Sequence, residues 1–322
     1  MNLEARSFWI AEPGRGEIRT ELLPPPANGD VVVRALFSGI SRGTESLVFA
    51  GRVPASEWTR MRAPFQAGNF PAPVKYGYAS VGRVEQGPTE LRDRAVFVLY
   101  PHQTRYVVPS SALHVLPEEV PPPRAVLAAY METAINGVWD AQVQPGDRVS
   151  VIGAGTVGCL AAWLVSKTRG CRVQLVDVNP RRAAIAGALG VSFAESEAAE
   201  DADVVIHASG AQAGLVRALE IAAFEARIVE LSWFGDQLVA LPLGGAFHAK
   251  RLTIASSQVG TVARPQRDRW DTRRRMQLAL SLLADPSLEA LITGESTFDE
   301  LPQVIVGLAA AAGDTLCHRI RY

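Results

Sequence analysis

A glycine-rich turn with an acidic residue downstream is the most chemically informative pattern in the sequence. Six consecutive residues fit G-x-G-x-x-G: Gly153, Ala154, Gly155, Thr156, Val157 and Gly158. The turn follows a predicted strand over 149–152 and opens a helix rich in alanine and leucine. In such a unit the glycines allow a tight turn, close approach of a pyrophosphate, and close packing of helix on strand. The helix N-terminus supplies free N–H groups for the phosphates, so the pattern predicts a dinucleotide site. The alternative is a glycine turn that only packs a helix on a strand.

Asp177 ends the next predicted strand, at the spacing where a dinucleotide fingerprint places its acidic residue. A carboxylate there would accept hydrogen bonds from the adenosine ribose of NAD and repel the 2′-phosphate of NADP. Arg181 and Arg182 follow closely and could instead hold that phosphate. We therefore expect NAD, with NADP as the alternative.

Strands and helices alternate after residue 148, which predicts βαβ units and a parallel sheet. The strands are predicted over 149–152, 172–176, 203–207 and 227–232, and the helices over 181–189 and 214–223. The first 118 residues are instead predicted to be mostly strands, over 31–37, 79–85, 95–100 and 105–108.

Three domains or parts are predicted from these patterns. Three prolines at 121–123 mark a boundary, because proline continues neither a helix nor a central strand. A helix is predicted over 124–141, two more over 273–284 and 302–312, and a final strand over 316–322. The predicted parts are a β-rich domain (1–119), a dinucleotide-binding domain (120–262) and a C-terminal return to the first domain (263–322).

Composition excludes several other classes of protein. Hydrophobic residues make up 48% of the 322 residues, and 32 basic side chains offset 33 acidic ones. A near-neutral chain has no overall field to attract nucleic acid or an anionic membrane. Three cysteines are too few for a disulfide framework, and no apolar stretch approaches membrane-spanning length. No signal peptide is visible, so a cytoplasmic protein is expected.

Further local patterns resemble those of the medium-chain dehydrogenase/reductase family, the relatives of alcohol dehydrogenase. Residues 38–45 (SGISRGTE) resemble its S-G-I-C-G-T-D segment, residues 76–84 (YGYASVGRV) its G-H-E-x-x-G-x-V, and residues 144–149 the turn before the first Rossmann strand. The resemblance covers essentially the whole chain. It implies an α/β fold, with a Rossmann doubly wound parallel sheet plus a β-rich GroES-like catalytic domain. It also implies an NAD(P)-dependent oxidoreductase with a small-molecule substrate, and a homodimer formed through the Rossmann domain.

The zinc ligands of this family are not matched. Ser41 or Arg42 takes the position of the first cysteine, Tyr78 and Ala79 replace the His-Glu pair, and the third position falls near Ala129. None of these is a suitable zinc ligand, and a catalytic zinc needs about three. We therefore predict an enzyme without zinc that acts on a carbonyl or alcohol. The alternatives are an enoyl or quinone reductase and a non-catalytic dinucleotide sensor.

Four residues are candidates for chemistry without a metal. Tyr78 either donates to a developing oxyanion or fills the volume that the metal would take. Thr44 aligns with the family's Ser/Thr proton relay, or caps the local backbone. Glu45 aligns with the adjacent acid, or forms a salt bridge to an arginine at the domain junction. Glu132 lies three residues beyond Ala129 on one helix face, so it points toward the cleft or is buried in an ion pair.

The resemblance also implies the residues around the cofactor. Ser209, Trp233 and Phe234 follow two Rossmann strands at the edge where doubly wound sheets bind ligands. The further candidates for contact with the cofactor are Arg42, Thr133, Asn136, Ser257 and Gln258. Arg42 would grip a phosphate or a substrate carboxylate, with a surface arginine as the alternative.

The segment from Gly51 to Lys75 shows no regular period but carries large apolar side chains, among them Trp58, Phe65 and Phe70. Loops of this length are uncommon unless they are functional. We expect the segment to cover the substrate and, together with Phe234, to form an aromatic pocket. The alternative is that its rings pack on the β-rich domain.

Two other sets of residues are predicted to be structural. The five histidines, none with metal-ligand spacing to a neighbour, are His102, His114, His207, His248 and His318. The arginine-rich stretch from Arg264 to Arg275 is predicted to be the solvated entrance of a helix, with a dock for an anionic substrate as the alternative.

Overall fold

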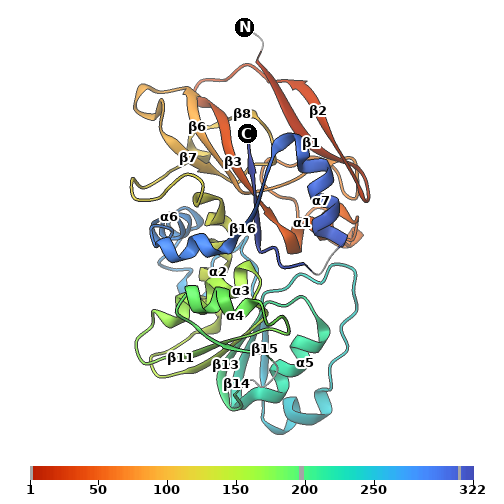
Figure 1. The fold of residues 1–322 in the computed structure, drawn as a ribbon, viewed down its shortest axis with the longest axis vertical. Coiled ribbons are helices and arrows are strands. Elements are labelled where there is room, and N and C mark those ends of the chain that lie inside the picture. The colour runs from red at the N-terminus through yellow and green to blue at the C-terminus, as the bar shows by residue number, and fades with distance from the viewer. Residues whose placement is uncertain (1–2, 196–198, 311–312) are drawn as a thin grey trace. The chain divides into compact units, whose positions relative to one another are not determined.

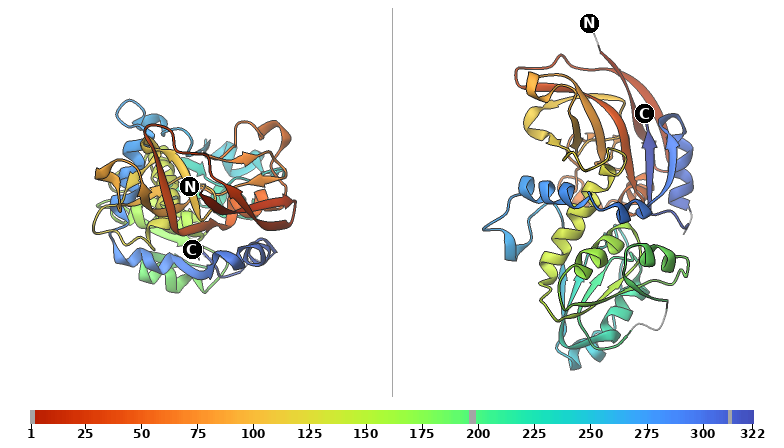
Figure 2. Two further views of the ribbon diagram at one scale, coloured as in Figure 1. Left: turned by 90° about the horizontal axis from the view of Figure 1, so that it is seen from above. Right: turned by 60° about the vertical axis from the view of Figure 1, so that its left-hand side comes forward.

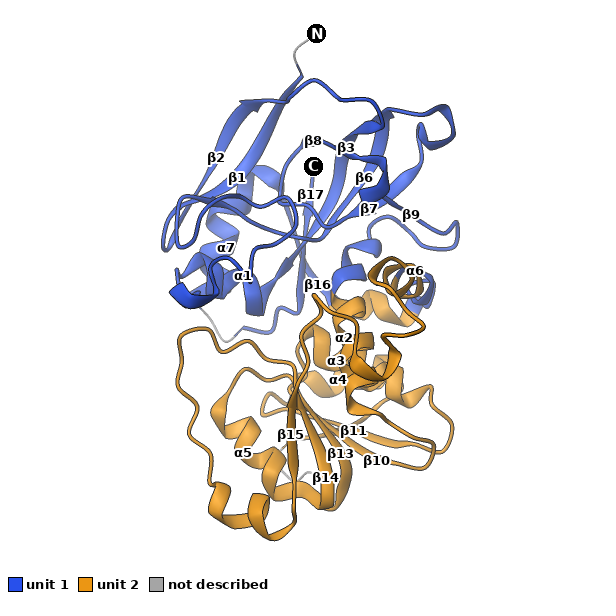
Figure 3. Ribbon diagram, turned by 180° about the vertical axis from the view of Figure 1, so that it is seen from behind, with its two compact units in different colours: residues 1–129, 280–286, 292–322 blue, residues 130–279, 287–291 orange. Residues whose placement is uncertain are grey.

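The computed structural model describes residues 3–195, 199–310 and 313–322. The chain forms two compact units, coloured separately in Figure 3. Unit 1 comprises residues 1–129, 280–286 and 292–322, and unit 2 comprises residues 130–279 and 287–291. The division after residue 129 falls inside a helix, a few residues past the boundary at 119 that was predicted from the proline run.

Unit 1 is built mostly from strands (Figure 1). Its larger sheet has the order β16-β17-β3-β6-β7-β9, with β8 paired to β3, and its smaller sheet has the order β2-β1-β5-β4. The strands of the larger sheet are β3 (Asp30–Ser41), β6 (Ser80–Gln86), β7 (Ala95–Val98), β8 (Arg105–Pro109), β9 (His114–Val115), β16 (Ile292–Thr297) and β17 (Cys317–Arg321). Those of the smaller sheet are β1 (Glu4–Glu12), β2 (Arg15–Leu22), β4 (Ala67–Gly68) and β5 (Val74–Lys75).

The core of unit 1 follows from the alternation along β3. Val31, Val33 and Ala35 point to one side of this strand and are buried against Val84, Val96 and Tyr106. Helix α1 (Arg42–Phe49) begins directly after β3 ends at Ser41. The end of β3 and the first turn of α1 therefore place the residues from 41 to 45 together. The other helix of this unit is α7 (Leu301–Ala310).

Unit 2 contains a sheet of six parallel strands in the order β12-β11-β10-β13-β14-β15, side by side in Figure 2. The strands are β10 (Arg148–Ile152), β11 (Arg172–Val176), β12 (Ser192–Ala194), β13 (Ala202–His207), β14 (Ala222–Glu230) and β15 (Thr253–Ser256). The helices are α2 (Ala128–Ala141), α3 (Thr156–Ser166), α4 (Arg182–Ala188), α5 (Gln212–Ile221) and α6 (Thr272–Leu282). The order reverses direction at β10, which is the topology of a doubly wound dinucleotide-binding sheet.

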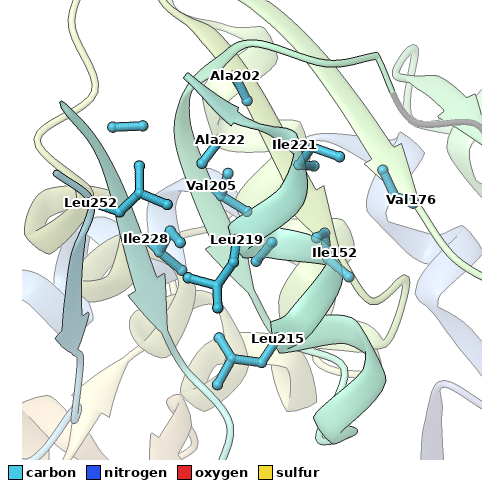
Figure 4. Packing of buried hydrophobic residues seen from close by; sticks show 12 residues of the cluster. Ile152, Val176, Ala202, Val205, Leu215, Leu219, Ile221, Ala222, Ile228 and Leu252 are labelled. Carbon is cyan, nitrogen blue, oxygen red and sulfur yellow. The ribbon is translucent and has the colours of Figure 1, made fainter. Parts of the chain in front are cut away.

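One apolar cluster of unit 2 lies between α5 and the sheet (Figure 4). Leu215 and Leu219 project from α5 onto Val205 of β13 and Ile228 of β14, and all four are buried. The strands read as nearly continuous apolar runs because a parallel sheet is covered on both faces. The α/β fold with a separate β-rich part is therefore confirmed.

Several predicted elements have different bounds in the structure. The predicted helix over 124–141 is a 3-10 turn at Ala125–Leu127 followed by α2. The helix predicted over 302–312 runs from Leu301 to Ala310, and residues 311 and 312 lie outside the described residues. The hairpin of β1 and β2 was not predicted. In the described ranges, no helix is long and apolar enough to cross a bilayer.

Candidate functional site

The glycine turn of unit 2 has the backbone geometry that its sequence predicts. Gly153 follows β10 with a φ of +103°, a backbone conformation that residues with a Cβ rarely adopt. A Cβ at Gly153 would lie 2.5 Å from the Ser209 nitrogen, and one at Gly158 would lie 1.9 Å from the Gly153 oxygen. Neither position accepts a larger residue. A Cβ at Gly155 would meet no atom within 4 Å, so the backbone there is open to an approaching phosphate.

Helix α3 begins immediately after Gly155, with Thr156 and Val157 in its first turn. The first amides of a helix have no acceptor within the helix, and they carry the positive end of its dipole. This arrangement can bind an anionic pyrophosphate.

Asp177, the first residue after β11, lies beside this turn. Its two carboxylate oxygens accept hydrogen bonds from the backbone N–H groups of Ala154 (2.7 Å) and Asn179 (2.9 Å). The side chain therefore holds the glycine turn in place and stays half-buried at its edge. Arg182 is 7% exposed at the start of α4, and Arg181 is exposed. Arg182 is close enough to the buried Cys159 thiol for its charge to oppose the rise in the pKa of Cys159 that burial causes.

His207, which was predicted to be structural, and Glu230, which was not singled out, form a hydrogen-bonded chain with Ser209 at the same edge of the sheet. His207 ends β13 and is fully buried; its Nδ1 lies 2.6 Å from Glu230 Oε2 and its Nε2 lies 2.6 Å from Ser209 Oγ. Phe234 stacks on the His207 ring, with the two ring centroids 6.3 Å apart. His207 and Glu230 face each other at the ends of adjacent strands. Their polar types at matching strand ends were the available sequence signal.

A buried polar network joins α2, α6 and the loop after β15. Arg275 is 1% exposed and donates from Nε to Glu132 Oε1 (3.1 Å) and from Nη1 to Asn136 Oδ1 (2.5 Å). Burial raises the pKa of Glu132, and the charge and hydrogen bond of Arg275 oppose that rise. Of the two readings of Glu132, the structure shows the buried ion pair. Arg275 corrects the expected solvated arginine stretch, because its side chain lies inside unit 2.

The remaining predicted cofactor residues are placed as follows. Thr133 is half-buried on α2, beside Glu132, and Trp233 is half-buried in the segment after β14. Ser257 and Gln258 lie in the loop after β15; the Ser257 N–H donates to the Glu230 carbonyl (3.0 Å). Gly153, Asp177 and Ser209 are thus brought together, with the other unit 2 candidates on the same unit.

In unit 1, Tyr78 meets the beginning of α1. The hydroxyls of Ser41 and Thr44 lie close enough to the Tyr78 phenol to lower its pKa. Burial raises the pKa of Tyr78 above its usual range, the negative charge of Glu45 raises it further, and the two hydroxyl groups lower it. The phenol is therefore a neutral hydrogen-bond donor at neutral pH.

Ser41 and Arg42, the two candidates for the lost cysteine position, have different surroundings. Ser41 contacts the Tyr78 phenol, whereas Arg42 donates from Nη1 to the carbonyls of Gly313 (2.6 Å) and Thr315 (3.2 Å). The guanidinium of Arg42 contacts backbone of its own unit.

Glu45 joins the cluster of Ser41, Thr44 and Tyr78 to buried side chains in the interior of unit 1. Its Oε1 accepts the Ser41 N–H (2.8 Å), and its Oε2 lies 2.8 Å from His102 Nε2. His102 Nδ1 in turn lies 2.7 Å from Ser38 Oγ, which lies 2.9 Å from the Tyr322 hydroxyl. Of the readings of Glu45, the structure places it in a buried pair, with a histidine rather than an arginine.

The residues of this cluster do not fit the zinc that the family resemblance implies. Ser41 and Tyr78 present hydroxyl groups, and Ala79 and Ala129 present methyl groups. Zinc prefers thiolate, imidazole and carboxylate ligands. In the described part of the chain, no three His, Cys, Asp or Glu side chains are grouped so that they could hold a metal ion.

The aromatic residues of the segment from 51 to 75 take different environments. Phe70 is 3% exposed and packs 5.8 Å from the Tyr76 ring, inside unit 1. Phe65 is 40% exposed and lies 5.3 Å from the Tyr100 ring. Trp58 is 37% exposed and donates from Nε1 to the Val53 carbonyl (3.0 Å). Phe70 is thus a core residue, whereas Phe65 and Trp58 keep accessible faces.

Comparison with known proteins agrees with this architecture. A scan against protein-family models found no match. D-guloside 3-dehydrogenase of Escherichia coli is 26% identical over 307 residues, which cover 85% of this chain and 87% of the relative. An uncharacterized zinc-type alcohol dehydrogenase-like protein of Haemophilus influenzae is 26% identical over 62% of this chain and 59% of its own length.

Solved structures show the same fold at lower identity. L-idonate 5-dehydrogenase of Escherichia coli superposes with a TM-score of 0.81 and 15% identity, over 100% of this chain and 99% of its own. Acetophenone reductase of Geotrichum candidum, solved in complex with NAD, superposes with a TM-score of 0.76 and 13% identity, over 99% of this chain and 97% of its own. The chain is similar to a zinc-type alcohol dehydrogenase-like protein and to several dehydrogenases, which confirms the predicted resemblance to the medium-chain dehydrogenase/reductase family.

Proposed function

We propose that the protein is an NAD(P)-dependent oxidoreductase that transfers a hydride between the nicotinamide and a small carbonyl or alcohol substrate. One observation carries this proposal: the turn from Gly153 to Gly158 opens α3 beside the Asp177 carboxylate. The relatives named as dehydrogenases and reductases support the same reaction class.

The dinucleotide is held by unit 2 in this proposal. The N–H groups of Thr156 and Val157 bind its pyrophosphate, and Asp177 accepts hydrogen bonds from the adenosine ribose. Bound nicotinamide supplies or accepts the hydride. NAD is the expected cofactor because the Asp177 carboxylate repels a 2′-phosphate, and the buried position of Arg182 limits its reach to one. Arg181, which is exposed, is the residue through which NADP would be accommodated.

We further propose that the reaction needs no zinc. Hydride transfer to a carbonyl develops negative charge on oxygen, and a preorganised neutral donor stabilises that charge. Tyr78 is such a donor, because its raised pKa keeps the phenol protonated and Ser41 and Thr44 orient it. Tyr78 therefore polarises the substrate oxygen where a metal does so in the zinc enzymes of the family.

The substrate also contacts the exposed rings of unit 1 in this proposal. Trp58 and Phe65 each keep more than a third of their surface accessible. Large aromatic rings contribute binding free energy when they cover an apolar substrate, and the exclusion of water helps hydride transfer. Phe70 anchors the segment by packing on the Tyr76 ring, and Phe234 stacks on the His207 ring.

The test is NADH oxidation by chelator-treated protein over a panel of aldehydes, ketones, enones and quinones. We expect a carbonyl substrate, and we expect Tyr78→Phe to lower kcat/KM by about 100-fold with NADH affinity unchanged. Tyr106→Phe is the matched control, because this buried tyrosine donates to or accepts from Ser80 and does not touch Ser41 or Thr44.

Other outcomes separate the alternatives. Reduction of C=C bonds alone would identify an enoyl or quinone reductase, since the same phenol can polarise a conjugated carbonyl. NADH binding without turnover of any compound would indicate a sensor. Equal rates for Tyr78→Phe and wild type would remove Tyr78 from the mechanism.

We also propose a homodimer formed through unit 2. β12 and β15 are the edge strands of its sheet, and an open edge carries unpaired backbone groups that favour pairing with another strand. Light scattering at micromolar concentration should give twice the chain mass of 34.6 kDa. A monomer under these conditions would contradict the proposal.

A further inference from the structure

We propose that Arg275 is a positioning residue for the nicotinamide half of the dinucleotide. It would act through the loop at residues 257–263, which follows β15. This inference rests on the proposed function, because it concerns the same cofactor. It adds a residue that touches neither the fingerprint turn nor the adenosine side of the site.

The order of the strands decides which end of the dinucleotide reaches this loop. The glycine turn lies at β10, in the middle of the sheet, and Asp177 lies at the end of β11 on one side of it. Ligands of doubly wound sheets lie across the carboxyl ends of the strands. With the pyrophosphate at β10 and the adenosine ribose at β11, the other half extends across β13, β14 and β15. The loop at 257–263 is the segment that leaves β15 at this edge.

Arg275 binds this loop from the inside of unit 2. Its Nη2 donates to the Val259 carbonyl (2.5 Å), and its Nη1 donates to the Thr261 carbonyl (3.4 Å). The guanidinium is 1% exposed, and its charge is offset by Glu132 (3.1 Å). The five donors of an arginine lie in one rigid plane, so they fix two carbonyls at defined angles.

Asn136 holds the loop at both ends. Its Oδ1 accepts the Ala263 N–H (2.9 Å) as well as a hydrogen from Arg275, and its Nδ2 lies 3.3 Å from Ser257 Oγ. Residues 257–263 are therefore tied to α2 and α6 through two side chains. A loop held in this way has little freedom to lose when a ligand binds it.

Fixing the Val259 carbonyl also fixes the N–H of the next residue. The C=O and N–H of one peptide unit point in opposite directions. Because the Val259 carbonyl points inward to Arg275, the Gly260 N–H points outward, where the exposed side chain of Gln258 accepts its hydrogen (2.7 Å). The Gln258 side chain is a carboxamide, the same group that nicotinamide carries. The outward N–H thus already binds a carboxamide oxygen in the chain itself.

The experiment compares two probes on purified full-length protein. NADH contains the nicotinamide half, and ADP-ribose contains the adenosine and pyrophosphate without it. We expect Arg275→Lys to weaken NADH binding by about tenfold, because an ammonium group cannot replace the planar fork. ADP-ribose binding should change by less than about twofold, since its contacts lie at β10 and β11. Arg274→Lys is the matched control: this neighbour on α6 is exposed and lies over the Trp270 ring.

The outcomes are distinguishable. Equal weakening of both probes by Arg275→Lys would show that Arg275 only stabilises unit 2, and unchanged NADH binding would show that it is not needed; either result overturns the proposal. If Arg275→Lys does not fold, Asn136→Ser provides the same comparison, and it must also weaken NADH more than ADP-ribose. Wild-type protein that binds neither probe would refute the proposed function itself, and this inference with it.

Discussion

Replacing Asp177 by asparagine tests the dinucleotide site most directly. The carboxylate has two tasks: it accepts the N–H groups of Ala154 and Asn179, and it carries the negative charge that selects against a 2′-phosphate. Asparagine retains one acceptor oxygen and removes the charge. We therefore expect NADPH binding to improve while NADH binding weakens.

The size of the change follows from the position of Asp177. The side chain is half-buried, so the energy of its interaction with a neighbouring charge lies between the value in bulk water and the value near a protein surface. Two unit charges 4 Å apart interact by about 1 kcal/mol in water and by about 4 kcal/mol at an effective dielectric constant near 20. Since about 1.4 kcal/mol is tenfold, we expect the ratio of NADPH to NADH affinity to rise by at least about fivefold.

The assay is a titration of intrinsic tryptophan fluorescence with each nucleotide, at low and at moderate salt. The repulsion and its loss should both be smaller at higher salt. Asp203→Asn is the control, because this carboxylate pairs with Arg148 at the opposite end of the same sheet. An affinity ratio that stays within twofold of wild type in a folded Asp177→Asn protein would refute the assignment of Asp177. A wild-type preference for NADPH would show that Arg181 or Arg182 dominates instead.

Three other predictions address the remaining sites. Metal analysis of protein purified without chelator should give far less than one zinc per chain, and a stoichiometric zinc would sink the proposed metal-free mechanism. Burial lowers the pKa of His318 below its ordinary value of 6.5, so its contribution to the free energy of unfolding is present above that pH and is lost as pH falls through the folded pKa. The free energy of unfolding, measured by urea titration at several pH values, should therefore fall less at acidic pH in His318→Gln than in wild type. An unchanged pH profile would contradict the assignment. Trp58→Ala and Phe65→Ala should raise KM or lower kcat for a bulky substrate by about tenfold without altering NADH affinity, since each ring loses its apolar contact; variants that lose only thermal stability would show that the rings merely pack on unit 1.

Local patterns predicted the parts of the fold that local interactions determine. The strand at 172–176 has the bounds that the sequence predicted, and the turn at 153–158 opens α3 as expected. The hairpin of β1 and β2 was missed, although Phe8 and Ile10 of β1 are buried and Trp9 between them is only half-buried. Its pattern is short and interrupted by charged residues, so periodicity alone did not identify it.

The polar clusters could not be predicted, because their members lie far apart in the sequence. His102 meets Glu45 across 57 positions, and Arg275 meets Glu132 across 143. A lone buried histidine or arginine has no local signature, and only the tertiary fold provides its partner. The sequence therefore identified Glu45 and Glu132 as candidates but left open which side chains face them.

The pairing of β17 with β3 has a consequence for the order in which the chain folds. Ser38 and Tyr322 meet across 284 positions, so residues 37–41 of β3 acquire their neighbour β17 only after residues 317–321 have left the ribosome. Until then residues 37–41 of β3 form an exposed edge with unpaired backbone groups, the kind of surface through which nascent chains aggregate. Unit 2 is almost one continuous stretch, from 130 to 279, and can assemble its sheet earlier. Synthesis would thus yield a folded nucleotide-binding half before the half that bears Tyr78 is complete, and a deletion of β17 would damage the second without preventing the first.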